Sequence, residues 1–143
     1  MYREIVNLNP GYLDTLLKGA PPTLFTAQLH RAYFSPGSTS YCILEENEPV
    51  FAGGIVNMQW NRGEAWMLPT RFFREHVKLC LKAMRKHLPL LAQDGKFQRV
   101  QATCVSGVSS KIFKHLGFHF EGVMLKFGPN GETCEMHARI FEP

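Results

Sequence analysis

The sequence lacks any apolar run of the ~20 residues that a membrane-spanning helix needs. Its first residues, 1–6, also lack a basic segment followed by an apolar stretch, so we expect no signal peptide and a soluble, cytoplasmic protein. Cysteine is sparse, and the four residues lie far apart: Cys42, Cys80, Cys104 and Cys134. This spacing fits neither a zinc site nor a disulfide framework, so we expect four reduced thiols and no metal site.

The sequence also has little excess of positive over negative side chains. The 143 residues include 16 Lys+Arg and 12 Asp+Glu, a formal net charge of +4, and 45% of them are hydrophobic. This composition excludes disorder, collagen and coiled coil, and it predicts one globular domain over residues 1–143. The charge alone selects no ligand, and no nucleic-acid-binding module is present, so we expect neither a nucleic acid nor a membrane as partner.

Turn residues and apolar periodicity divide the first half of the chain into elements. Asn9-Pro10 predicts the start of a helix over 10–18 after a short strand over 3–8, and Pro21-Pro22 starts a second helix. Alternation from residue 41 predicts a hairpin of strands 41–45 and 49–57. A turn at 61–63 then leads into a short apolar strand over 64–68, which we expect to be central in the sheet.

The second half begins with the clearest helix, over 71–93, which Asp94-Gly95 closes. We expect Pro89 either to kink this helix or to tighten its final turns. We expect the helix to pack Val77, Cys80, Met84 and Leu88 on the sheet. A strand over 97–105, a helix over 109–116 capped by Gly117, and a hairpin of 118–127 and 132–141 follow. Right-handed crossovers predict that strands 64–68 and 97–105 are parallel neighbours, splaying near residues 68–70.

A run near the C-terminus carries a family resemblance. Residues 114–122, Lys-His-Leu-Gly-Phe-His-Phe-Glu-Gly, followed by Asn130-Gly131-Glu132, resemble the C-terminal signature of the GCN5-related N-acetyltransferases (GNAT). The element order resembles this family over the whole chain. The resemblance implies an α/β fold with a mixed, mostly antiparallel central sheet flanked by helices, a splayed parallel strand pair and a C-terminal hairpin. It also implies acetyl-CoA as cofactor and a small-molecule or protein amine as acceptor.

Residues 63–70, Gly-Glu-Ala-Trp-Met-Leu-Pro-Thr, are similar to a GNAT branch encoded by bacteriophages and prophages. That branch includes small internal virion proteins of short-tailed phages. This resemblance implies a second class of function, a non-catalytic protein of virion assembly with a degenerate acetyl-CoA site. Its partners would be phage structural proteins, in the host cytoplasm or the phage particle.

The family's glycine-rich phosphate loop corresponds to residues 69–74, which contain no glycine. We expect an anion site from Thr70 as N-cap and the next amides, with charge from Arg71 and Arg74; the alternative is a solvated basic face. The other cofactor-binding positions that the resemblance implies are Leu68, Ser106 and Ser109. Ser106 stands where the family often has Asn, and a serine at a helix start is more often a cap.

The resemblance also assigns acid and base positions. Phe113 stands where the family frequently has a tyrosine acid, and a phenyl ring cannot protonate a thiolate. Glu64 stands where similar enzymes place a carboxylate that takes a proton from the amine, so it is the candidate catalytic base; the alternative is an exposed glutamate at a strand edge. We expect Trp66 in the core, Trp60 on a cleft, and His137 facing either a cleft or solvent.

Overall fold

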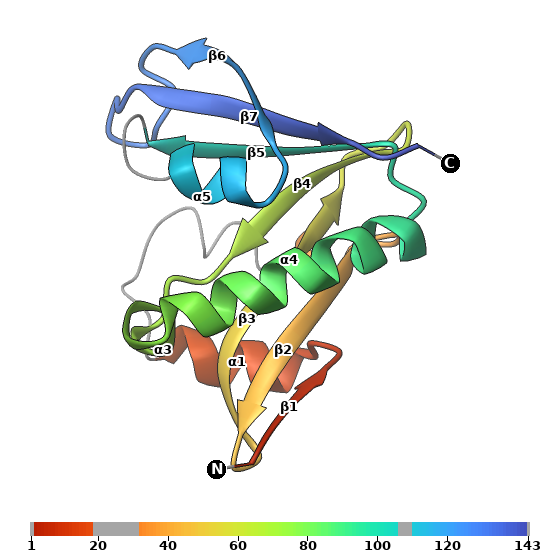
Figure 1. Ribbon diagram of the computed structural model, residues 1–143, viewed down its shortest axis with the longest axis vertical. Helices are drawn as coiled ribbons and strands as arrows, with labels where there is room; N and C mark the ends of the chain where they lie inside the picture. The colour runs from red at the N-terminus through yellow and green to blue at the C-terminus, as the bar shows by residue number, and fades with distance from the viewer. Residues whose placement is uncertain (1, 19–31, 106–109, 143) are drawn as a thin grey trace.

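The computed structural model describes residues 2–18, 32–105 and 110–142 (Figure 1). Its strands form one seven-stranded sheet in the order β1-β2-β3-β4-β5-β7-β6, in which β4 is central as predicted. All neighbours are antiparallel except β4 and β5, which are parallel, so the predicted mixed, mostly antiparallel sheet is confirmed. The strands are β1 Arg3–Val6, β2 Thr39–Glu45, β3 Glu48–Asn57, β4 Arg62–Met67, β5 Arg99–Val105, β6 His119–Met124 and β7 Cys134–Ile140.

The β2–β3 hairpin turns where the sequence predicts it. Glu46 and Asn47 both have positive φ, 49° and 67°, which is the backbone of a two-residue turn that matches strand twist. The hairpin places Gly53 and Gly54 in the middle of β3, opposite Met67 and Trp66 of β4. Two adjacent residues without side chains therefore lie beside the central strand.

Capping explains the first helix and the last. In α1, Pro10–Lys18, the Asn9 side chain accepts a hydrogen bond of 2.8 Å from the Tyr12 N–H, as expected of an N-cap. In α5, Ser110–His115, Gly117 ends the helix with φ 86°, a conformation that glycine adopts without strain. The helix predicted after Pro21-Pro22 falls on residues 19–31, outside those described, and a short 3-10 helix, Ala32–Phe34, follows them.

The single helix predicted over 71–93 is wrong, because the chain forms two helices there. These are α3, Arg71–Glu75, and α4, Val77–Asp94, separated by His76 at φ −133° and ψ 48°. The break turns Val77 outward, and it is 38% exposed instead of packed on the sheet. Cys80 and Leu88 are buried and Met84 is half-buried, as expected. Pro89 lies inside α4, which continues to Asp94.

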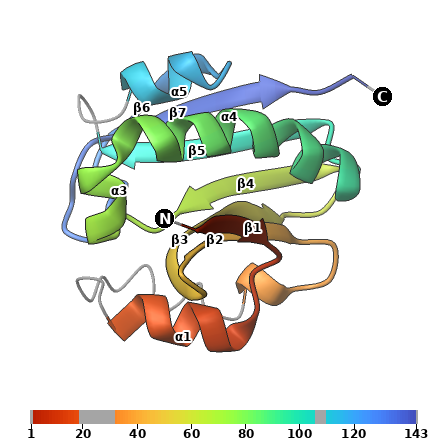
Figure 2. The same ribbon diagram turned by 60° about the horizontal axis from the view of Figure 1, so that its bottom comes forward.

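The sheet has a helical layer on each face (Figure 2). Alternate residues of β3 point to opposite sides, so Phe51 and Ile55 pack with α4 while Ala52 and Val56 pack with α1. Within the described part of the chain, no helix is long and apolar enough to cross a membrane. The two apolar clusters meet the central strand from either side, and this places β4 between two packed layers.

Candidate functional site

The sheet opens between β4 and β5. Their parallel ladder joins three residue pairs, from Arg62 with Arg99 to Glu64 with Gln101, and stops. Beyond it, β4 stays paired with β3 to Met67, and β5 stays paired with β7 to Val105. We call the gap between residues 65–67 and 102–105 the opening. The predicted splay is confirmed, but it begins at residue 65 rather than at 68–70, because each strand follows its own antiparallel neighbour.

One backbone edge of β4 faces the opening. The Leu68 N–H donates to the Ala52 carbonyl of β3 at 3.0 Å, and the Met58 N–H donates to the Arg62 carbonyl at 2.8 Å. In an antiparallel ladder, every second residue bonds to the same neighbour, so the even-numbered residues of β4 bond to β3. Ala65 and Met67 therefore turn their N–H and C=O groups toward the opening, beyond the end of the β4–β5 ladder.

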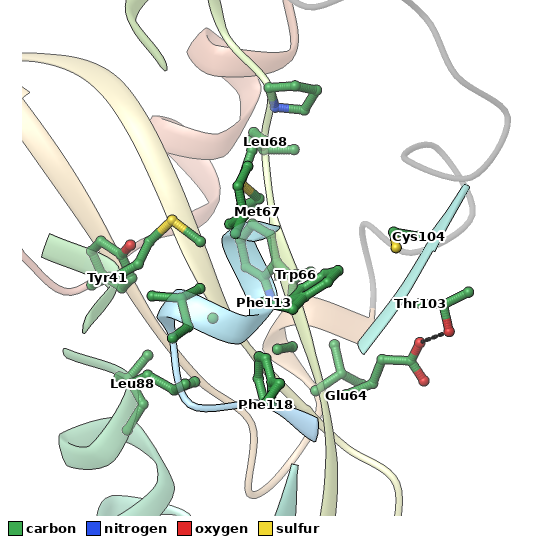
Figure 3. A pocket seen from close by; sticks show the side chains of 18 of the residues that line it. Tyr41, Glu64, Trp66, Met67, Leu68, Leu88, Thr103, Cys104, Phe113 and Phe118 are labelled. Carbon is green, nitrogen blue, oxygen red and sulfur yellow. Dashed lines mark hydrogen bonds between the residues drawn. The ribbon is translucent and has the colours of Figure 1, made fainter. Parts of the chain in front are cut away.

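A cavity of about 600 Å³ fills the opening and reaches both faces of the sheet (Figure 3). On the α1 face, its wall includes the Tyr33 ring, which stacks on Trp66 with centroids 3.8 Å apart and an interplanar angle of 8°. The wall is largely apolar and includes Val56, Met58, Met67, Met84, Leu88 and Phe118. A mostly apolar pocket with a few polar groups is the usual form of a small-molecule site.

Glu64 is the carboxylate of this cavity. Thr103 donates a hydrogen bond from Oγ1 to its Oε1 at 3.3 Å (Figure 3). Gln101 donates from Nε2 to its Oε2 at 3.4 Å. Both donors are on β5, so the side chain spans the opening. Glu64 is half-buried, unlike the exposed strand-edge glutamate of the alternative interpretation.

Two polar groups of the wall are buried without a hydrogen-bond partner among the described residues: the Tyr41 hydroxyl and the Trp66 indole Nε1. Each lies over a glycine of β3. A Cβ on Gly53 would be 3.3 Å from the Tyr41 Oη, and one on Gly54 would be 2.9 Å from the Trp66 Nε1. Burial raises the pKa of the Tyr41 hydroxyl well above its usual range, so this group remains an O–H donor at neutral pH.

The turn from β4 to α3 has the predicted cap. Thr70 accepts a hydrogen bond from the Phe73 N–H at 3.3 Å and donates one to the Val50 carbonyl at 2.8 Å. The cations after it have partners within the turn. Arg71 pairs with Glu75 at 2.7 Å and lowers the pKa of that carboxyl, while Arg74 donates to the Pro69 carbonyl at 3.1 Å.

The remaining cofactor-binding predictions divide into two kinds. Leu68 is buried and lines the cavity, where its side chain adds to the apolar wall. Ser106 and Ser109 lie outside the described residues, so their predicted roles remain predictions.

The structure corrects the predicted positions of Trp60 and His137 and locates Phe113 relative to the cavity. Trp60 is 83% exposed beside Arg62, and Trp66 takes the place on the cavity wall that was expected of Trp60. His137 faces neither a cleft nor solvent, because it is buried with its Nε2 3.3 Å from Glu135. Phe113 lies between this histidine and the cavity, with ring centroids 5.0 Å apart. The position for which the resemblance implies an acid is therefore at the cavity wall.

The sequence argument did not single out Tyr41, Thr103 or Cys104 as lining residues. Adjacent Gly53 and Gly54 in an otherwise apolar strand were the available signal, because glycine inside a strand often marks a close approach. Among the described residues, no group of three or more His, Cys, Asp or Glu side chains could hold a metal ion.

The fold is shared with solved acetyltransferases. The ribosomal-protein-S18-alanine N-acetyltransferase from Escherichia coli matches with a TM-score of 0.80 at 9% identity, over 99% of this chain and 96% of that one. A GNAT-family acetyltransferase from Streptococcus pneumoniae matches with 0.75 at 11% identity, over 99% and 100%. A chimera of the spermidine N-acetyltransferase SpeG from Vibrio cholerae and hSSAT matches with 0.76 at 7%, over 96% and 95%.

No protein-family model matches the chain, and no curated protein sequence matches it significantly. The structural matches cover nearly all of each chain at identities of 7–11%, so they establish the fold. The chain has the GNAT fold, with the splayed strand pair and the C-terminal hairpin predicted from the sequence.

Proposed function

We propose that the protein is an acetyl-CoA-dependent N-acetyltransferase that transfers an acetyl group directly to a small-molecule or protein amine. The observation that carries this proposal is the half-buried carboxylate of Glu64 in the opening between β4 and β5. Three solved acetyltransferases with the same fold support the reaction class. The acceptor is a primary or secondary amine of unspecified structure.

The opening suits the pantetheine arm and the thioester of acetyl-CoA. The arm contains amide groups, which need both donors and acceptors, and the backbone edge at Ala65 and Met67 supplies both. The apolar side chains of the wall suit the aliphatic parts of the arm. When bound, acetyl-CoA supplies an acetyl group activated as a thioester.

Glu64 would act on the amine. Its carboxylate can accept the proton that the amine loses as it bonds to the acetyl carbon, directly or through one water. Trp66 and Tyr33 lie on the same face of the sheet as Glu64 and line the same cavity. Phe113 can donate no proton to the leaving group, so CoA would leave as a thiolate; an ordinary thiol pKa of about 8.5 makes that a tolerable leaving group without an acid.

The turn after β4 would hold the pyrophosphate. In the first turn of α3, the Phe73 amide is bonded to the Thr70 cap, and the amides of Arg71 and Phe72 have no acceptor within the helix. The exposed Arg71–Glu75 pair contributes little stability in water, so a phosphate can replace the carboxylate at low cost. The cations oppose the helix dipole unless an anion binds there, which supports this placement.

A second candidate is a non-catalytic protein of phage assembly or of the virion. Two observations favour it: Phe113 replaces the acid, and Pro69 removes an N–H from a turn that already lacks glycine. Calorimetry with acetyl-CoA separates the two candidates. We expect saturable binding by the unmodified protein. No binding at millimolar acetyl-CoA would exclude the acetyltransferase proposal and favour the assembly role.

The acceptor is tested after binding. Release of CoA can be followed by chromatography with an amine panel that includes spermidine and an N-terminal alanine peptide, the acceptors named for two proteins of the same fold. We expect transfer to at least one amine. Binding of acetyl-CoA without transfer to any panel member would support the non-catalytic candidate.

A further inference from the structure

Hydrogen bonds continue from Glu64 across the sheet, beyond the cavity. Gln101 donates from Nε2 to Glu64 Oε2 at 3.4 Å, and Arg99 donates from Nε to Gln101 Oε1 at 3.3 Å. Arg99 also donates from its two terminal nitrogens to the Glu121 carboxylate, at 2.8 Å and 2.5 Å. We call these four residues, Glu121, Arg99, Gln101 and Glu64, the polar row. It connects the edge strand β6 to the central strand β4.

Glu121 reaches the polar row from a β-bulge. The ladder between β6 and β7 shifts here: Phe120 pairs with His137, and Gly122 pairs with Met136. Glu121 is therefore an extra residue without a partner in the ladder, and a bulge of this kind commonly re-aims one side chain. Its carboxylate meets Arg99 of β5 although β7 lies between their two strands. Hydrogen bonding to Arg99 lowers the pKa of Glu121, so this carboxylate keeps its charge to more acidic pH.

Arg99 determines which way the Gln101 amide points. A guanidinium group only donates hydrogen bonds, so the amide must turn its oxygen toward Arg99. The amide NH₂ then faces the Glu64 carboxylate, to which it donates. The two parallel bonds from Arg99 to Glu121 restrict the guanidinium more than a single bond would. Each member of the polar row is thus matched to the next as donor to acceptor.

Glu64 is held at both of its oxygens. Thr103 donates to Oε1, and Gln101 donates to Oε2. Each carboxylate oxygen accepts more than one hydrogen bond, so both keep capacity for an incoming N–H. Donated hydrogen bonds favour the ionised form of a carboxyl group, which is the form that can accept a proton.

The charged groups near Glu64 are cations. Arg99 acts on it through Gln101, and Arg62 lies two residues earlier on β4, on the same face of the strand. Among the described residues, β3 and the 3-10 helix contribute only uncharged side chains to the cavity wall. Neither Gln101 nor Arg99 lines that wall, so they can affect the reaction only through Glu64.

We propose that Gln101 is a positioning residue for Glu64: it holds the ionised carboxylate in the orientation that accepts the amine proton, while Arg99 and Glu121 hold the Gln101 amide. This inference rests on the proposed function, since it assigns a partner to the same base. The proton passes from the amine nitrogen to Glu64 as the nitrogen–carbon bond forms, and the carbon–sulfur bond of the thioester breaks. Gln101 gives up no proton and takes none.

The polar row contributes little to holding the strands together. The side chains of Arg99 and Glu121 are 31% and 42% exposed, and ion pairs in contact with water stabilise a fold only weakly. Backbone pairing already joins β4 to β5 as far as Glu64 and Gln101. The bond between these two side chains therefore acts on the carboxylate more than on the sheet.

The test is a double-mutant cycle between Gln101 and Glu64. CoA release is measured with the amine panel, spermidine and the N-terminal alanine peptide among them, and the acceptor with the fastest transfer is used throughout. The variants are Gln101→Leu, Glu64→Gln and the two combined. Gln98→Leu is the matched control, because Gln98 is an exposed glutamine just before β5. Circular dichroism, thermal unfolding and acetyl-CoA calorimetry verify that each variant is folded and binds.

We expect Gln101→Leu to lower kcat by about 10- to 10²-fold, the loss that a misplaced reacting group causes. The KM for acetyl-CoA should change less than about twofold, because the amide does not touch the cofactor. In the Glu64→Gln background, Gln101→Leu should lower kcat by less than about twofold further, since the residue acts through the carboxylate. A merely structural role would instead give the same loss in both backgrounds.

Gln101→Glu provides a second readout if Gln101→Leu does not fold. It keeps the size of the side chain and the acceptor for Arg99, but it replaces the donor to Glu64 with a second carboxylate. Adjacent carboxylates disfavour ionisation, so the acidic limb of the kcat/KM profile should move to higher pH. Turnover lost at low pH should recover as the pH rises. Arg99→Lys, which keeps the charge but loses the fork, should lower kcat less than Gln101→Leu does.

Two results would overturn the inference, and they differ in what they say of the proposed function. If an amine is acetylated and Gln101→Leu behaves like Gln98→Leu, or loses the same factor with and without Glu64, Gln101 does not position the base and the proposed function stands. If acetyl-CoA binds but no panel amine is acetylated, the proposed function fails and the positioning role fails with it.

Discussion

Thr103 Oγ1 donates a hydrogen bond of 3.3 Å to Glu64 Oε1, from the β5 side of the opening to the β4 side. The two residues belong to strands that stop pairing at Glu64 and Gln101, so this contact lies just past the end of the ladder. It holds the carboxylate across the opening, where a ligand along β4 would reach it.

Glu64→Gln should separate binding from chemistry. The amide keeps the size of the side chain but cannot accept a proton, so we expect acetyl-CoA affinity to change less than twofold. Turnover should fall by about 10²- to 10⁴-fold, the usual contribution of a general base. Calorimetry and CoA release measure the two effects, and Glu48→Gln, on the exposed start of β3, is the control. Unchanged turnover would exclude Glu64 as the base.

Replacing Arg71 and Arg74 together with Ala should weaken acetyl-CoA binding at least tenfold, because two charge-assisted contacts to the pyrophosphate are lost. The fold should be preserved, since Arg71 is highly exposed and its ion pair with Glu75 is at the surface. Lys96→Ala, at an exposed lysine outside the β4–α3 turn, is the control. An affinity equal to that of the control would mean that this turn is a solvated basic face.

Gly54→Ala should destabilise the protein by about 1–3 kcal/mol, as overpacking does in a close-packed core. A Cβ at this position would be 2.5 Å from the Thr39 carbonyl oxygen and 2.9 Å from the Trp66 Nε1. Gly122→Ala is the matched control, because a Cβ there meets nothing within 4 Å. Urea unfolding should show the control unchanged or more stable by up to ~1 kcal/mol. Equal stabilities would contradict the close packing at Gly54.

His87 should make stability depend on pH. Burial and, secondarily, the neighbouring charge of Lys86 lower its pKa from 6.5, and its ring stacks on Tyr41 with centroids 5.3 Å apart. Below pH 6.5, the unfolded chain takes up this proton before the folded chain does, so the free energy of unfolding falls as pH falls toward the lower folded pKa. His87→Gln should reduce this fall. Urea unfolding between pH 5 and 8 measures it, and identical slopes would contradict it.

The cysteines should titrate as four free thiols in denaturant without reductant. In the native protein, Cys104 should react first, because it is partly accessible while the other three are buried. Burial also raises the pKa of Cys42 to about 12 and that of Cys80 to about 11, which leaves little reactive thiolate. Mass spectrometry after brief alkylation identifies the modified residue. Recovery of two thiols, or first labelling at Cys42, would contradict this account.

Local signals in the sequence were sufficient for the order of the elements. Asn9 and Thr70 cap their helices as expected, and Gly117 ends α5, since these interactions involve residues close in sequence. The break at His76 was not predictable, because the apolar period continues across it.

The walls of the site depend on contacts between distant segments. The sequence analysis placed Trp60 on a cleft and Trp66 in the core, but Trp60 is exposed and Trp66 lines the cavity, where Tyr33, distant in sequence, stacks on it. His137 is buried because Phe113 and Phe120 cover it. The family resemblance located Glu64, and the partners Thr103 and Gln101 required the parallel register of β4 and β5.

The short ladder between β4 and β5 divides the sheet into two antiparallel halves, β1–β4 and β5–β7, joined by three residue pairs. A ligand that bonds to the free edge of β4 and packs against β5 takes the place of the missing part of the ladder. It would connect the two halves of the sheet beyond the three residue pairs of the ladder. Occupancy of the opening and rigidity of the whole sheet would then be thermodynamically linked, so the protein would be stiffest with the proposed cofactor bound.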